Sequence, residues 1–232
     1  MIHRKIALII FFFVLANHSS ADAIEEIVVT ASMASDGYYD MPAITLKKKA
    51  DFLVQEVRFV NDSRSPDLRK TEIINSISAF LRAARKSKGI ELSYGDGFLL
   101  PVDLTDDSLQ LINDRTRIDT NYVDIYVKSS VTDSVEVKEQ ISKLRSFIAK
   151  QKLSGRTEIE PRGDIGLSIV GPEQYRYEIL RKITQENDRI RAIVGEQCSI
   201  TVGGLEGRVT WERTSVDELT LYIPYGTEIK CG

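Results

Sequence analysis

A strand–helix–strand unit between Asp51 and Glu91 constrains the fold of this chain more than any other feature of its sequence. The first strand of the unit, DFLVQEVRFV, places Leu53, Val57 and Phe59 on one face. Charged side chains interrupt the apolar pattern on the opposite face, so we expect this strand to be buried mainly on one side. Burial on one side is typical of antiparallel sheets and disfavours a parallel sheet covered on both faces.

The helix of this unit carries consistent start and stop signals. Ser65 is expected to cap it, and Pro66 suits the first helical position. Apolar residues then recur at helical spacing, basic residues gather in the last turns, and Gly89 is expected to end the helix.

The same strand–helix–strand order recurs at residues 121–155 and 165–202. The strand NYVDIYV alternates apolar and polar side chains, and the helix after it has an apolar stripe at intervals of three and four residues. A third helix is expected to open at Gly171 and to bury Ile179, Ile183 and Ile193. This order predicts an α+β fold in which about three helices pack on one face of an antiparallel sheet.

The first 23 residues have the pattern of a secretory signal peptide. A basic start at Met1–Lys5 precedes the apolar run Ile6–Ala16 and a small-x-small cleavage site at Ala21–Ala23. The apolar run has eleven residues, against the roughly 18 to 20 that a spanning helix needs, so cleavage is favoured over retention as an anchor. We therefore expect residues 24–232 to form one periplasmic α+β domain without a transmembrane span.

Charge disfavours two classes of partner. Removal of Arg4, Lys5 and Asp22 with the signal peptide changes the formal net charge from −3 to −4. The acidic balance, without a basic block, argues against binding of nucleic acid or of an anionic membrane surface.

Histidine and cysteine usage excludes several chemistries. Both histidines, His3 and His18, lie in the signal peptide, so the mature chain lacks the base of Ser-His-Asp catalysis and the commonest transition-metal ligand. No phosphate loop or metal spacing is present, and we predict no cofactor, no metal and no catalytic residue. Cys198 and Cys231 are expected to form a disulfide, because the cysteines of exported proteins meet an oxidising environment. The bridge would close a loop of about 34 residues and stabilise the fold by roughly 3 to 4 kcal/mol. Two unpaired thiols are the alternative.

Two charged clusters are interpreted as solvated surface. Lys47–Lys49 is conceivable as a phosphate or lipid site, but lysines in an edge strand more often oppose aggregation. The carboxylates between Asp103 and Asp107 suggest calcium, yet they lack the glycine and the distal glutamate of an EF-hand loop.

The N-terminal segment of the mature chain has two interpretations. Its β-branched run predicts the first strand of the sheet, although residues 24–43 could instead form a flexible segment. The letters EEIVVTA also resemble the TonB-box region of TonB-dependent outer-membrane receptors, and an exposed extended segment can pair with the sheet edge of another protein. The candidate partner-binding residues here are Glu25, Glu26, Ile27, Val28 and Val29.

Several stretches together resemble the SIMPL-domain family of exported proteins. The resemblance rests on VVTAS, KADFLVQEVRF, INSISAFLRAARKSKGI, NYVDIYV and GEQCSITV. It covers nearly all of the mature chain, and it implies a single periplasmic domain that is not known as an enzyme. Some members of the family form ring-like oligomers.

Three functional hypotheses follow. The first is a non-enzymatic exported binding or assembly protein of the bacterial envelope, which associates with an envelope protein or with itself; Tyr122 and Tyr126, on a polar strand face, are candidate partner-binding residues. The second is a histidine-free hydrolase of cell-wall glycan that uses two carboxylates. The candidate carboxylates are Glu56, Asp96, Asp103 and Asp124. The third is an accessory protein that contacts TonB.

Overall fold

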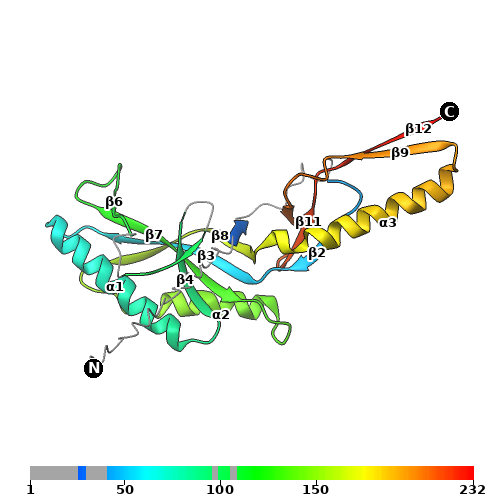
Figure 1. Cartoon of the computed structure of the whole chain (residues 1–232). Coiled ribbons are helices and arrows are strands. Elements are labelled where there is room, and N and C mark those ends of the chain that lie inside the picture. The colour runs from blue at the N-terminus through cyan, green and yellow to red at the C-terminus, as the bar shows by residue number, and fades with distance from the viewer. Residues whose placement is uncertain (1–25, 30–40, 96–98, 105–108) are drawn as a thin grey trace, which may run out of the picture.

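A computed structural model describes residues 26–29, 41–95, 99–104 and 109–232 of the chain. The helices are α1 (Pro66–Lys86), α2 (Val137–Ala149), the short 3-10 helix η2 (Pro172–Tyr175) and α3 (Arg176–Val194). The strands are β1 (Glu26–Val29), β2 (Leu46–Lys49), β3 (Phe52–Asn61), β4 (Ile90–Tyr94), β5 (Leu100–Pro101), β6 (Ile112–Asn113), β7 (Asn121–Ser130), β8 (Glu158–Val170), β9 (Cys198–Gly203), β10 (Thr210–Arg213), β11 (Glu218–Tyr222) and β12 (Gly226–Cys231). The molecule is elongated: a large sheet with α1 and α2 forms one end, and α3 extends from it with β9 and β12 (Figure 1).

The large sheet has seven strands, all paired antiparallel. Its order is β1-β8-β3-β7-β4-β5, and β6 pairs with β7. The central strand β3 pairs with β7 along its whole length, from Phe52 opposite Ser130 to Asn61 opposite Asn121. On its other side β3 pairs with β8, with a shift in register between Val54 and Glu56. The prediction of an α+β fold built on antiparallel sheet with three helices is confirmed.

The two faces of β3 differ as the sequence pattern predicts. Leu53, Val57 and Phe59 have no exposed surface. Helix α1 covers this face with Ile73, Ile77 and Phe80, and α2 covers it with Leu144 and Ile148. The ring of Phe80 lies 5.6 Å from Phe59 and 5.3 Å from Phe147 between ring centroids, so it joins β3, α1 and α2.

Helix α1 begins and ends close to the predicted positions, but not by all the predicted means. Ser65 is its N-cap residue, yet its side chain makes no capping hydrogen bond, so that detail of the prediction is wrong. Pro66 occupies the first turn, and the helix ends at Lys86. Gly89 follows with a φ of +78°, a conformation that glycine adopts without steric cost.

The third helix differs from the prediction in where it lies. It opens with η2, and Ile179 and Ile183 are its buried residues. Lys48 of β2 reaches it through an ion pair with Glu178 and a contact with the ring of Tyr175. Its C-terminal half extends away from the seven-stranded sheet beside β9 (Figure 1), and Ile193, expected to face inward, is 83% exposed. The spacing of the hydrophobic residues predicted the helix, but it could not show where the helix extends beyond the residues that it packs against.

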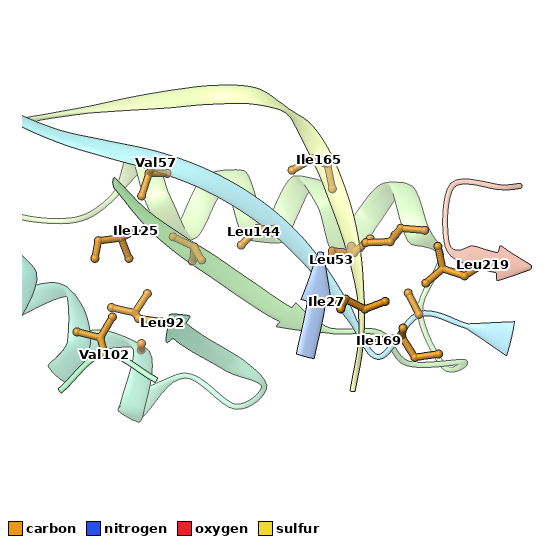
Figure 2. Close-up of a cluster of buried hydrophobic side chains, with 14 of the residues drawn as sticks. Ile27, Leu53, Val57, Leu92, Val102, Ile125, Leu144, Ile165, Ile169 and Leu219 are labelled. Atoms are coloured by element: carbon orange, nitrogen blue, oxygen red, sulfur yellow. The ribbon is translucent and has the colours of Figure 1, made fainter. Parts of the chain in front are cut away.

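A second sheet connects this helix to the main body. It has three strands in the order β10-β11-β2, and Leu219 and Leu221 of β11 have no exposed surface. Arg213 of β10 donates a hydrogen bond of 2.7 Å to the carbonyl oxygen of Ile165 in β8. Leu219 lies close to Ile169 of β8 in the buried cluster (Figure 2), so the two sheets share one core.

The remaining sheet is a two-stranded ribbon of β9 and β12. Cys198 lies opposite Cys231 at one end of the ribbon, and the two form a disulfide, as predicted. Strand β12 was not expected from the sequence. The sequence also suggests a short edge strand at residues 115–118, but these residues form no strand in the structure. The short strand that pairs with β7 is β6, at Ile112–Asn113.

Candidate functional site

The face of the seven-stranded sheet opposite α1 and α2 is polar. Every second residue of β3 points there, including Glu56 and Arg58, and the register places charged or aromatic residues of β7 and β8 beside them. The residues of this polar face are Glu56, Arg58, Tyr122, Asp124, Tyr126, Glu160 and Arg162. All of these residues belong to long, paired strands, and the strand pairing fixes their positions relative to one another.

Arg58 organises one part of the polar face. Its guanidinium donates two hydrogen bonds of 2.8 Å to the carboxylate of Asp124, directly opposite on β7. It also lies over the ring of Tyr122, 3.6 Å from the ring centroid. The hydrogen bond to Asp124 raises the pKa of Arg58 above its ordinary value. Tyr122, predicted as a partner-binding residue, therefore has a structural partner in Arg58.

Glu56 lies in a different environment. It faces Tyr126 across the β3–β7 pair, and Asp124 is its diagonal neighbour. Partial burial raises the pKa of Glu56, and the charge of Asp124 raises it further, while Arg58 and Arg162 act in the opposite direction. In the part of the chain that the structure describes, Arg58 forms an ion pair with Asp124 and not with Glu56.

Glu56 and Asp124 open into one pocket of about 450 Å³. The other residues that line it are Tyr94, Gly95, Leu109, Gln110, Ile112, Val123 and Tyr126. Two carboxyl groups in contrasting environments are the arrangement from which acid and base roles arise. Of the other predicted carboxylates, Asp103 does not line this pocket, and Asp96 lies outside the described residues.

A buried ion pair lies on the same side of the sheet, beyond the residues of the polar face. The ammonium group of Lys128 lies 2.5 Å from the carboxylate of Glu26, which also accepts a hydrogen bond of 2.7 Å from Ser168. The side chains of Lys128 and Glu26 are only 4% and 10% exposed. Lys128 also lies 3.2 Å from Glu91 and 4.0 Å from the ring centroid of Phe52.

This ion pair lies at a pocket with a volume of about 690 Å³. The lining is mainly apolar and comes from the end of α1, from β4 and β5, and from Phe52 and Val170. Two strands that are not neighbours in the sheet, β1 and β7, contribute the two charges. The pair therefore fixes β1 to the centre of the sheet, where an unpaired charge would be costly.

The predicted partner-binding segment lies largely inside the fold. Strand β1 pairs antiparallel with β8, from Glu26 opposite Val170 to Val29 opposite Leu167. Glu26 and Ile27 are buried, Val28 is half-buried, and Glu25 lies outside the described residues. The carbonyl of Glu26 also accepts a hydrogen bond from the amide of Leu99.

A second candidate surface is the segment that extends from the body. We call α3, β9 and β12 together the C-terminal arm. Tyr177 and Ile193 of α3 are 76% and 83% exposed, and Ile229 of β12 is 43% exposed. Every residue of β12 is exposed. Sequence reasoning missed this surface because it placed Ile193 in the core and did not recognise the alternation of Thr227, Glu228, Ile229 and Lys230 as a strand.

The described residues include neither a metal-binding cluster nor a membrane-spanning helix. In the described ranges, no three His, Cys, Asp or Glu side chains are grouped so that they could hold a metal ion. No helix among the same residues is long and apolar enough to cross a membrane.

Neither the protein-family models nor the curated proteins include a match to this chain.

The buried ion pair gives a first testable prediction. We expect Lys128→Met to lower the free energy of unfolding by about 3 to 5 kcal/mol, because it leaves the carboxylate of Glu26 buried without a cation. Glu26→Gln should lower the free energy of unfolding by less, since Lys128 keeps its ion pair with Glu91. Urea denaturation of the two single variants and of the double variant measures the coupling energy between Glu26 and Lys128. The double variant should lose less free energy of unfolding than the two single variants lose together.

The matched control is Lys143→Met. Lys143 pairs with Glu139 on the exposed face of α2, where both side chains are about 60% exposed, so its loss should change stability little. Equal effects of Lys128→Met and Lys143→Met, or additive effects of the two changes at Glu26 and Lys128, would contradict the assigned role.

Proposed function

We propose that this protein is a non-enzymatic exported binding or assembly protein of the bacterial envelope, and that it associates through the C-terminal arm. The single observation that carries the proposal is the exposure of that arm, where Tyr177, Ile193 and all of β12 are accessible. The resemblance of its sequence to the SIMPL-domain family, some of whose members form oligomers, supports the same function.

Within the C-terminal arm, the ribbon of β9 and β12 is supported by α3 and by the Cys198–Cys231 disulfide. A two-stranded ribbon is marginally stable by itself in water, and three or more strands or a covering helix are usually needed. Helix α3 covers one face of the ribbon near β9, where Ile200 and Val202 are half-buried, but Ile229 of β12 is left more exposed. Association would bury this apolar surface, which is the usual origin of affinity between proteins.

The compartment is part of the proposal. The first 23 residues have the charge and apolar pattern of a signal peptide. The Cys198–Cys231 disulfide is of the kind that forms and persists in oxidising compartments such as the periplasm. Its position across the ends of β9 and β12 ties the arm together, so export would also serve the stability of the associating surface.

Association can be tested with the mature chain. We expect light scattering after size-exclusion chromatography to show species larger than the monomer at micromolar concentration. Ile193→Lys combined with Ile229→Lys should shift the protein toward monomer, because two charges then replace the exposed apolar residues of the arm.

The matched control is Ile112→Lys combined with Ile118→Lys on the main body. These residues are 47% and 92% exposed, against 43% and 83% for Ile229 and Ile193. The control pair therefore adds the same charge at equally exposed positions and should leave association unchanged. A wild-type protein that is monomeric throughout, and that also binds no protein of an envelope extract, would overturn the proposed function.

The pocket of Glu56 and Asp124 supports a second candidate function, a histidine-free hydrolase of cell-wall glycan. The raised pKa of Glu56 suits a proton donor, and the bidentate contact with Arg58 keeps Asp124 in position as the charged partner. Tyr94 and Tyr126 at the same pocket offer rings against which a sugar can pack.

Hydrolysis of labelled peptidoglycan tests this candidate. If the pocket is catalytic, Glu56→Gln and Asp124→Asn should each lower the rate by about 100-fold or more, whereas Glu160→Gln on the same polar face should not. The rate should also fall as the pH rises through the raised pKa of Glu56, because the donor then loses its proton. Absence of hydrolysis by the wild-type protein would reject the candidate.

A further inference from the structure

The backbone of β12 has one open side, and the structure shows which of its residues point there. The amide of Gly232 donates a hydrogen bond to the carbonyl of Gln197, its cross-strand neighbour just beyond the ends of β9 and β12. Hydrogen-bonded and non-hydrogen-bonded pairs alternate along an antiparallel ladder. The alternation makes Lys230, Glu228 and Gly226 the residues that bond to β9, and it leaves Thr227, Ile229 and Cys231 with their amide and carbonyl groups directed away from β9.

The disulfide supports this assignment independently. The Cα atoms of Cys198 and Cys231 are 4.0 Å apart, which fits the closer spacing of a non-hydrogen-bonded pair. Across the described residues, β12 pairs with β9 alone. The outward amide and carbonyl groups of β12 are therefore free to accept another strand.

We propose that the occupant of this edge is β12 of a second copy of the chain, paired antiparallel about a two-fold axis at Ile229. This inference rests on the proposed function, association through the C-terminal arm, and it names the partner and the register. Ile229 would lie opposite Ile229 of the second copy, and Thr227 opposite Cys231 of the second copy. These are the residues whose backbone groups point outward, so each such pair can exchange hydrogen bonds in both directions.

Charge selects this register. Glu228 and Lys230 lie on the same face of β12, with side chains 62% and 72% exposed, and in one chain they form an ion pair of 2.9 Å. A two-fold axis at Ile229 places each Glu228 opposite Lys230 of the second copy. An axis at Glu228 would instead oppose two glutamates, and an axis at Lys230 would oppose two lysines; like charges directly opposite are destabilising.

The opposite face of the paired ribbon gains apolar contacts. Ile229 lies beside Ile200 of β9, on the face that carries the half-buried Ile200 and Val202. In the dimer, the two copies of Ile229 would be neighbours at the centre of a four-stranded antiparallel sheet. Four strands with helices on one face make a more stable unit than an isolated ribbon.

A charge-swap experiment tests both the partner and the register. Glu228→Lys leaves only lysines on the charged face of β12, and Lys230→Glu leaves only glutamates. By analytical ultracentrifugation of the full mature chain, each variant alone should dimerise about tenfold more weakly than the wild type, because two cross-strand attractions become repulsions. An equimolar mixture of the two variants should restore wild-type affinity as a heterodimer, since every lysine then faces a glutamate.

The control is the same pair of changes on α2. Glu139→Lys and Lys143→Glu alter charge equally at an exposed ion pair outside the arm, and they should leave dimerisation unchanged alone or mixed. If the arm variants dimerise like the wild type, or if their mixture gains nothing, the β12 pairing is wrong although association through the arm stands. A wild-type chain without self-association would overturn the pairing, and the proposed function would then depend on a different partner.

Discussion

The structure depends on β3 having two unlike faces between two long antiparallel partners. Its apolar face, with Leu53, Val57 and Phe59 fully buried, holds α1 and α2. Because side chains alternate along a strand, the other face must then receive Glu56 and Arg58, and the registers with β7 and β8 supply their partners. A slip of one residue would bring these charges under the helices. The polar face is thus a direct consequence of how the core is built.

The same body leaves its C-terminal arm with much less support. The core reaches α3 in its first half, where Ile179 and Ile183 are buried and Leu180 packs against the core, and β12 is exposed along its whole length. The disulfide between Cys198 and Cys231 holds the ends of β9 and β12 together, but it adds no cover to the open edge of β12. A rigid body with an exposed, self-complementary strand is a simple physical basis for assembly, and it requires no reactive group.

Local sequence signals were sufficient for some parts of this structure and insufficient for others. The faces of β3, the extent of α1, the presence of α2 and the disulfide follow from spacing and residue type. The pairs Glu26–Lys128 and Arg58–Asp124 could not be predicted, because they depend on strand order and on registers between segments far apart in the chain. The prediction of the position of α3 was wrong for a related reason. The periodic isoleucines of a helix do not show where the core that it packs against ends. Strand β12 is short and polar, so its alternation was too weak a signal.

Amide hydrogen exchange of β12, followed by NMR over a range of protein concentrations, tests the central claim most directly. If β12 pairs with its copy, the amides of Thr227, Ile229 and Cys231, which point away from β9, should become protected as concentration rises, whereas those of Glu228 and Lys230 should be protected throughout by β9. Rapid exchange of the outward amides at every concentration, with the inward amides protected, would show that the edge stays open and would contradict the account.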